Sequence, residues 1–228
     1  MDKNSYLFDI IEWDIQNWSI ALKYWEKNSS QNLANCSALE IGSRHGGLSL
    51  WMALQGANVI CSDMGGPTET ARKKHSAYGV SNLVKYESLD ATNLSYTEQF
   101  DVVCFKSVLG GIGRYDHKEC QVKAICEIYK SLKKGGELFF AENLVASPLH
   151  QLLRRKFIRW GDAWRYISGE EMEEFLSPFA EIKYLSVGFL GAFGRTETQR
   201  KILGYVDKIM DPVVPSHWKY IIVGIAKK

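Results

Sequence analysis

One stretch of the chain, residues 37–63, constrains the fold more than any other. It reads SALEIGSRHGGLSLWMALQGANVICSD, and its apolar runs predict a strand, a glycine-rich turn, a helix and a second strand. Glu40 stands at the end of the first strand, and Asp63 follows the second. Strands joined through a helix pair in parallel, so this stretch predicts an α/β protein with a mainly parallel sheet.

The glycine-rich turn predicts a binding site for a nucleotide-like ligand. Ligands of open α/β sheets bind outside the carboxyl ends of the strands, and glycine lets the backbone approach them closely. A carboxylate at the position of Asp63 is placed to bind the hydroxyls of a ribose. The spacing E-x-G-x-x-x-G is formed by Glu40, Gly42 and Gly46. It departs from the dinucleotide fingerprint G-x-G-x-x-G, because Arg44 stands where that pattern has its second glycine.

The rest of the chain continues the alternation of strands and helices. The apolar run FDVVCF at 100–105 suits a parallel strand that is covered on both faces. Further strands are expected at 83–88, 137–142, 179–188 and 220–226. Helical spacing of apolar residues between them places helices on both faces of the sheet.

Composition narrows the class of protein. The 228 residues suit one α/β domain with added segments, and the net charge of +2 names no partner by itself. The 5 cysteines are scattered without a C-x-x-C pair, so we expect reduced thiols, a cytoplasmic location and no metal site. The chain shows neither a signal peptide nor an apolar run near the roughly 20 residues that cross a bilayer.

The glycine-rich turn resembles motif I of the class I S-adenosylmethionine-dependent methyltransferases, which reads (D/E)-x-G-x-G-x-G. The run YKSLKKGGELFF at 129–140 is similar to that family's helix, K-x-G-G turn and central strand. The residues after 105 resemble motif IV, where donor and acceptor meet. The resemblance implies a Rossmann-like doubly wound sheet of seven strands, mainly parallel with the last strand antiparallel. It also implies S-adenosylmethionine as the methyl donor and S-adenosylhomocysteine as the product.

The resemblance further implies which residues hold the donor. These are Glu40, Gly42, Ser43, Arg44, Gly46, Asp63, Met64, Asp90, Ala91, Lys106 and Ser107. Asp90 can also be read as a solvated turn residue. Many related enzymes carry a histidine where Gly110 or Gly111 stands, so the role of that histidine is not assigned here.

Two segments outside these motifs complete the expected organisation. Residues 1–35 are expected to form a helical cover, and 36–228 to form the methyltransferase domain, with cap segments at about 144–178 and 190–216. The apolar face of the cover is expected to pack on the sheet. The alternative is that its tryptophans, Trp13, Trp18 and Trp25, form a lid over the site.

The first cap segment combines basic and aromatic residues and has two interpretations. As a pocket it would hold an anionic or sugar-bearing acceptor, since arginine forks suit carboxylate and phosphate. The substrate-binding candidates are Arg154, Arg155, Trp160, Trp164 and, from the second cap, Arg195. As an amphipathic cap helix it would turn Leu149, Leu152, Leu153 and Phe157 inward and leave its arginines solvated.

A hydroxyl acceptor benefits from a base that takes its proton, a gain of roughly 10²- to 10⁴-fold. His150 is the first candidate, because it follows the fifth strand, and Glu142 and Asp162 come next. The alternative for His150 is a solvated residue at the start of a helix. In the second cap a helix over 199–210 is expected, with Ile202, Val206 and Ile209 as its apolar side. In the family such a segment shapes an acceptor pocket; the alternative is a packing or dimer contact.

The wider sequence resembles bacterial methyltransferases of surface polysaccharide synthesis, which implies O-methylation of a sugar or glycan. Runs that carry this resemblance include EIGSRHGGLSLW, FKSVLGGIG and AENLVASPLHQ. One alternative is an O- or N-methyltransferase of another small molecule or a lipid. Further alternatives are an RNA methyltransferase that uses the arginines between 154 and 165, and a non-catalytic partner that binds S-adenosylmethionine. Nucleic acid is not the favoured partner, and the oligomeric state is open.

Overall fold

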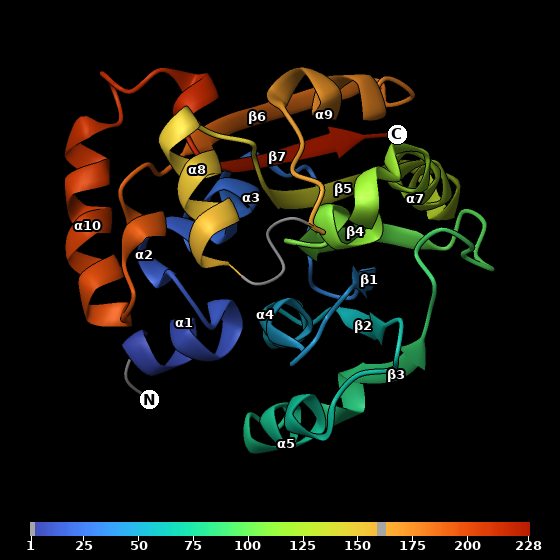
Figure 1. Cartoon of the computed structure of the whole chain (residues 1–228). Coiled ribbons are helices and arrows are strands. Elements are labelled where there is room, and N and C mark those ends of the chain that lie inside the picture. Colours follow the sequence, from blue (N-terminus) through green and yellow to red (C-terminus); the bar gives the residue numbers. More distant parts are fainter. Residues whose placement is uncertain (1–2, 159–162) are drawn as a thin grey trace.

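A computed structural model of the chain describes residues 3–158 and 163–228 (Figure 1). Its centre is a seven-stranded sheet in the order β3-β2-β1-β4-β5-β7-β6. The strands are β1 Ser37–Ile41, β2 Asn58–Asp63, β3 Val84–Ser88, β4 Phe100–Lys106, β5 Leu132–Asn143, β6 Glu181–Val187 and β7 Ile221–Lys227. Strands β1 to β5 pair in parallel, whereas β7 runs antiparallel to both β5 and β6. The predicted Rossmann-like sheet with an antiparallel last strand is therefore confirmed.

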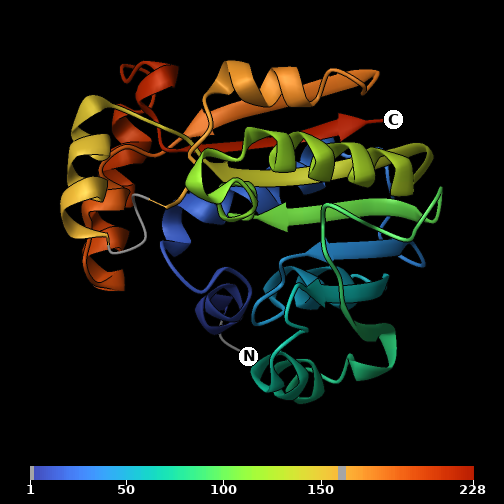
Figure 2. The same ribbon diagram turned by 45° about the vertical axis from the view of Figure 1, so that its right-hand side comes forward.

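Helices cover both faces of this sheet (Figure 2). They are α1 Lys3–Ile11, α2 Ile15–Trp18, α3 Ile20–Asn28, α4 Gly47–Leu54, α5 Glu69–Ala77, α6 Leu109–Ile112, α7 Lys118–Ser131, α8 Pro148–Phe157, α9 Gly169–Phe175 and α10 Glu197–Met210. Consecutive residues of one strand enter opposite cores, as Val102 and Val103 of β4 do. This two-sided burial explains why the strands read as continuous apolar runs.

Helix α3 packs on the sheet, as the periodicity predicts, whereas α1 packs on α4 and α2 on α10. Trp25 of α3 stacks on Phe139 of β5 with ring centroids 5.6 Å apart, and its indole N–H donates to the carbonyl of Gly224 at 3.0 Å. The helical region is broken at Glu12 and Asp14, where φ is 71° and 45°. Non-glycine residues rarely adopt these dihedrals inside a helix, so separate helices form. The domain boundary at residue 35 stays a prediction.

Helices α8 and α10 reverse the expected orientation of their apolar faces. On α8, Leu152 is 55% exposed, whereas Arg154 is buried and donates from Nη1 to the carbonyls of Leu144 and Val145. The expectation that Leu149, Leu152 and Phe157 face inward is therefore wrong. Of the arginines expected to be solvated, Arg154 is buried and Arg155 is exposed. The reason is that two strand-end carbonyls need donors, which only a polar side chain supplies.

On α10 the predicted apolar side faces the solvent. Ile202 is 61% exposed and Ile209 is 80% exposed, and Val206 is exposed as well. The buried side is formed instead by Gly204 and Asp207. Asp207 accepts hydrogen bonds from the backbone N–H groups of two loop residues, which fixes the rotation of the helix. Across the described part of the chain, no helix is both long enough and apolar enough for a bilayer crossing.

Candidate functional site

The turn after β1 needs glycine at two positions. Gly42 and Gly46 have φ of 64° and 68°, which side chains rarely adopt. A Cβ on Gly42 would lie 2.6 Å from Val108 Cγ2, and one on Gly46 would lie 2.6 Å from His75 Cε1. Arg44 also has a positive φ, of 49°, so the turn keeps a tight path although the middle glycine of the motif is replaced.

Glu40 fastens this turn to the helix that follows it. Its buried carboxylate accepts from the backbone N–H of Leu48 at 3.3 Å and from that of Ser49 at 2.7 Å. It also accepts from the Ser49 hydroxyl at 2.5 Å. Burial raises the pKa of Glu40 to about 7. Glu40 thus orients the start of α4, with both oxygens already engaged.

Asp63 lies at the end of β2, next to the glycine turn. Its Oδ2 accepts from the backbone N–H of Arg44 at 2.9 Å. No described residue donates to the other oxygen, which is therefore available for a diol. Beside it, the side chain of Met64 is 76% exposed and could cover a planar ring.

Asp90 follows β3 and closes a turn of its own. Its Oδ1 accepts from both the backbone N–H and the hydroxyl of Thr92, each at 2.8 Å. Oδ1 therefore has the role that the solvated-turn alternative gives Asp90, while Oδ2 of this exposed carboxylate accepts no hydrogen bond from a described residue. Ala91 beside it is buried.

Ser43 gives the most direct sign that the turn is built for a polar ligand. Its Oγ is buried beside the thiol of Cys61 and forms no hydrogen bond to a nitrogen or oxygen atom of the described residues. Buried hydroxyls without partners are uncommon, because an unmade hydrogen bond is costly. Together with the two glycines and the open oxygen of Asp63, this hydroxyl fits the polar groups of S-adenosylmethionine.

Lys106 stands at the end of β4 beside a pair of tryptophans, Trp13 and Trp18, whose ring centroids are 5.0 Å apart. Its Nζ lies 5.3 Å from the ring centroid of Trp13 and 5.1 Å from that of Trp18. Within residues 3–158 and 163–228 it forms no ion pair or hydrogen bond. Burial lowers the pKa of Lys106 to about 8, although nearby carboxylates such as Glu12 and Glu40 oppose this effect. Its neighbour Ser107 accepts from the Asn143 amide at 2.6 Å.

Glu142 has no free oxygen for a substrate. Its Oε2 accepts from the backbone N–H groups of Val108 and Leu109 at 2.8 and 2.7 Å, and its Oε1 accepts from that of Asn143 at 2.8 Å. Burial raises the pKa of this carboxyl group. Glu142 therefore joins the ends of β4 and β5, and its geometry favours a positioning role.

His150 is buried, so it is not the solvated residue of the alternative interpretation. Its Nδ1 is hydrogen-bonded to Ser147 Oγ at 2.7 Å and its Nε2 to the carbonyl of Phe189 at 2.8 Å. Burial lowers the pKa of His150 to about 4. With both nitrogens engaged, His150 has no free lone pair for a substrate proton. The geometry therefore corrects the first choice of base, and the third candidate, Asp162, lies outside the described residues.

Two arginines of the first cap, Arg154 and Arg165, are bonded to other groups of the fold. Arg165 pairs with Asp116 at 3.0 Å and with Glu171 at 2.5 Å, and Arg154 is bound to strand-end carbonyls. Arg155 is exposed, as is Arg195 in the second cap. Trp160 lies outside the described residues.

A cavity of about 380 Å³ opens beside these residues. Its described lining includes Gln151, Arg155, Trp164 and Tyr166. Trp164 packs against Gly110 and Gly111, and its buried Nε1 has no partner among the described residues. Neither the contact between Trp164 and Gly110 nor the position of Lys106 beside two tryptophans was predicted from the sequence. The pair of glycines after β4 was the signal from which the Trp164 contact could have been predicted.

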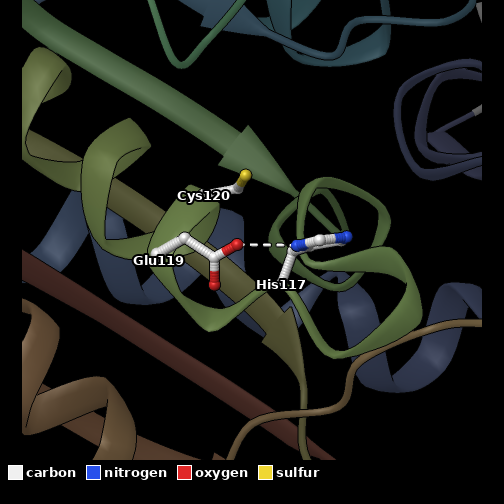
Figure 3. Close-up of side chains that lie close together, drawn as sticks. All are labelled: His117, Glu119 and Cys120. Carbon is white, nitrogen blue, oxygen red and sulfur yellow. Dashed lines mark hydrogen bonds and ion pairs between the residues drawn. The ribbon is translucent and has the colours of Figure 1, made fainter.

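Metal-binding groups were expected to be absent, and the described residues offer one weak candidate. His117, Glu119 and Cys120 place their ligand atoms within 4.8 Å of one another at the start of α7 (Figure 3). His117 and Glu119 are exposed and already hydrogen-bonded to each other at 2.6 Å. The cluster therefore stands as a surface ion pair.

Comparisons with known proteins agree with this geometry. Residues 39–140 match the family described as "Methyltransferase domain". The "Ubiquinone biosynthesis O-methyltransferase" of Pseudomonas syringae pv. tomato is 35% identical over 113 residues, which cover 48% of this chain and 45% of that protein. The protein of that name in Pseudomonas putida strain W619 is 29% identical over 168 residues, or 64% of this chain and 68% of the relative. The chain thus spans about half the length of the first of these relatives.

Solved structures show the fold. The MccD protein aligns with a TM-score of 0.63 at 17% identity, covering 92% of this chain and 96% of that one. The Haemonchus contortus phosphoethanolamine N-methyltransferase 2, in complex with S-adenosyl-L-methionine, aligns with a TM-score of 0.65 at 16% identity over 92% of this chain and 52% of that one. The chain therefore has the class I methyltransferase fold, and its residues 39–140 match a methyltransferase domain.

Proposed function

We propose that this chain transfers a methyl group from S-adenosylmethionine to a hydroxyl oxygen of a small molecule. The observation that carries the proposal is the similarity, up to 35% identity, to proteins named for O-methylation in ubiquinone biosynthesis. The geometry supports it through the tight glycine turn, the open oxygen of Asp63 and the unpartnered Ser43 hydroxyl.

The donor would be held at the carboxyl ends of β1, β2 and β4. When bound, S-adenosylmethionine supplies a methyl group that is already activated on a sulfonium. Asp63 would bind the ribose hydroxyls, and Ser43 would donate to or accept from a polar group of the donor. Glu40 would act indirectly, by holding the turn against α4. Most of the rate then comes from alignment, for which effective molarities reach ~10⁵ M and beyond.

Lys106 is the proposed base for the acceptor hydroxyl. A neutral amine takes a proton only if its pKa lies near the working pH, and burial brings the pKa of Lys106 to about 8. The faces of Trp13 and Trp18 stabilise the ammonium that forms, since aromatic rings attract cations. The proton would move from the acceptor oxygen to Nζ as that oxygen attacks the methyl group.

Acceptors of two kinds follow from the similarities. The relatives are named as O-methyltransferases of ubiquinone biosynthesis, which favours a compact hydroxylated compound as the acceptor. A sugar or surface glycan stays the second proposal, because Arg155 and Trp164 line the cavity and suit a sugar ring. Binding of RNA phosphates by the cap arginines is less well supported, because Arg154 and Arg165 are already bonded to groups of the fold.

The deciding experiment is calorimetric titration with S-adenosylmethionine and S-adenosylhomocysteine, followed by an acceptor screen. Micromolar binding of both is expected, and turnover with compact hydroxylated compounds should produce S-adenosylhomocysteine faster than turnover with nucleotide sugars. Absence of binding would overturn the site assignment. Binding without turnover on any hydroxyl acceptor would favour the non-catalytic partner instead.

A further inference from the structure

Helices α8 and α10 lie at one end of the molecule (Figures 1 and 2), and both expose apolar side chains. The surface formed by these side chains, here called the α8–α10 surface, consists of Leu149, Leu152, Phe157, Ile202, Tyr205, Val206 and Ile209. The exposed fraction of Phe157 is 61% and that of Ile209 is 80%. Single exposed apolar residues are ordinary, but a group of them marks an interaction site.

Buried polar contacts hold both helices in this outward orientation. His150 of α8 is bonded through Nε2 to the carbonyl of Phe189 at 2.8 Å. Asp207 of α10 accepts from the N–H groups of Leu190 and Gly191 at 2.6 and 2.8 Å. Rotating either helix to bury its apolar face would break these bonds and leave buried polar groups unpaired. The outward face is thus a fixed property of the fold.

The exposed charges on the two helices have one sign. Arg155, Lys156, Lys201 and Lys208 are exposed and form no ion pair with any described residue. The sequence of α8 contains no acidic residue. The acids of α10 are used elsewhere, since Glu197 pairs with Arg200 at 2.7 Å and Asp207 is buried. The α8–α10 surface therefore joins apolar side chains to unpaired positive charge.

We propose that the α8–α10 surface docks this protein onto an anionic phospholipid bilayer. Apolar side chains with flanking lysines and arginines are the composition of helices that lie in a bilayer interface. Tyr205 suits this position, because its ring is apolar and its hydroxyl is polar. A second copy of the chain fits less well, since it would bring like charges together across the contact. The docking is independent of the proposed methyl transfer and can be measured without turnover.

The test is sedimentation with vesicles of phosphatidylcholine alone and of phosphatidylcholine mixed with phosphatidylglycerol. The full chain should bind the mixed vesicles, bind the neutral vesicles far more weakly, and dissociate as salt is added. The pair Lys201→Gln and Lys208→Gln should weaken binding by about fivefold for each lysine. The pair Ile202→Ser and Ile209→Ser should abolish sedimentation with either vesicle.

The matched control is the pair Lys85→Gln and Lys134→Gln, which makes the same change in net charge on exposed residues outside this surface. It should bind within about twofold of the wild type if the effect is local. Equal losses in both lysine pairs would overturn the proposal, as would failure to bind the mixed vesicles. A stable dimer in light scattering that Ile209→Ser dissociates would assign the surface to self-association instead. Unchanged circular dichroism shows that each variant folds.

Discussion

The indole of Trp164 lies directly on Gly110: a Cβ added to that glycine would be 1.7 Å from Trp164 Nε1. The backbone holds the two segments together, since Arg165 N–H donates to the Gly110 carbonyl at 3.1 Å and Tyr115 N–H donates to that of Ala163 at 2.9 Å. A residue of the first cap thus fills the space beside the end of β4. This contact joins the proposed acceptor cavity to the strand that carries Lys106.

Gly110→Ala should displace Trp164 and impair acceptor use without impairing donor binding. The inserted methyl group overpacks the contact, which costs about 1–3 kcal/mol of unfolding free energy. A shift of the ring should lower kcat/KM for the acceptor by roughly 10- to 100-fold. The measurements are steady-state kinetics, calorimetric affinity for S-adenosylhomocysteine and thermal unfolding. Gly169→Ala is the control, because nothing lies within 4 Å of its added Cβ, and unchanged kinetics in Gly110→Ala would contradict the assignment.

Asp63→Ala should nearly abolish binding of the donor. The substitution removes the acceptor for the Arg44 N–H and the proposed partner of the ribose, and charged hydrogen bonds contribute about 1.5–3 kcal/mol each. The dissociation constant of S-adenosylhomocysteine should therefore rise by at least about tenfold, as measured by calorimetry. Glu181→Ala removes an exposed carboxylate on β6 and should leave that constant unchanged. An unaltered affinity in Asp63→Ala would place the donor elsewhere.

Lys106→Met should remove the pH dependence that a lysine base produces. In the wild type, kcat/KM should rise with pH and level off above about 8, because the neutral amine is the active form. In the variant, kcat/KM should no longer rise with pH, and it should be lower than in the wild type by about 10²- to 10⁴-fold. Lys85→Met, on an exposed lysine of β3, should keep the wild-type profile. A variant that binds the donor weakly but keeps the limb would show that Lys106 contacts the donor rather than the acceptor.

Asp14→Asn should flatten the dependence of stability on pH. Burial raises the pKa of Asp14 to about 7, from an ordinary value of 3.8. Between these two values the folded state binds the proton more tightly than the unfolded state, so stability from this group falls as pH rises. The unfolding midpoint in denaturant should drop less from pH 4 to pH 7 in the variant than in the wild type. Glu69→Gln, on an exposed carboxylate of α5, should keep the wild-type slope.

The strands and the glycine turn could be predicted from the sequence because their signals are local, whereas the Rossmann-like arrangement of the sheet followed from the resemblance to class I methyltransferases and the donor-binding residues stay a prediction. The continuous apolar runs of β1 and β4 indicate burial on both faces, whatever lies far along the chain. The turn between Gly42 and Gly46 needs positive dihedrals that the residue types themselves reveal. The place of Asp63 at the end of β2 could likewise be predicted from the apolar run before it.

Only the tertiary structure decided which way α8 and α10 face and how His150 is engaged. His150 bonds to Phe189, 39 positions away, and Asp207 bonds to Asn17, 190 positions away. No local pattern encodes such contacts. They oppose the apolar periodicity of both helices, because leaving a buried polar group without a partner costs more than exposing a leucine or an isoleucine. The lowered pKa of Lys106 likewise comes from the burial that the folded chain creates around it.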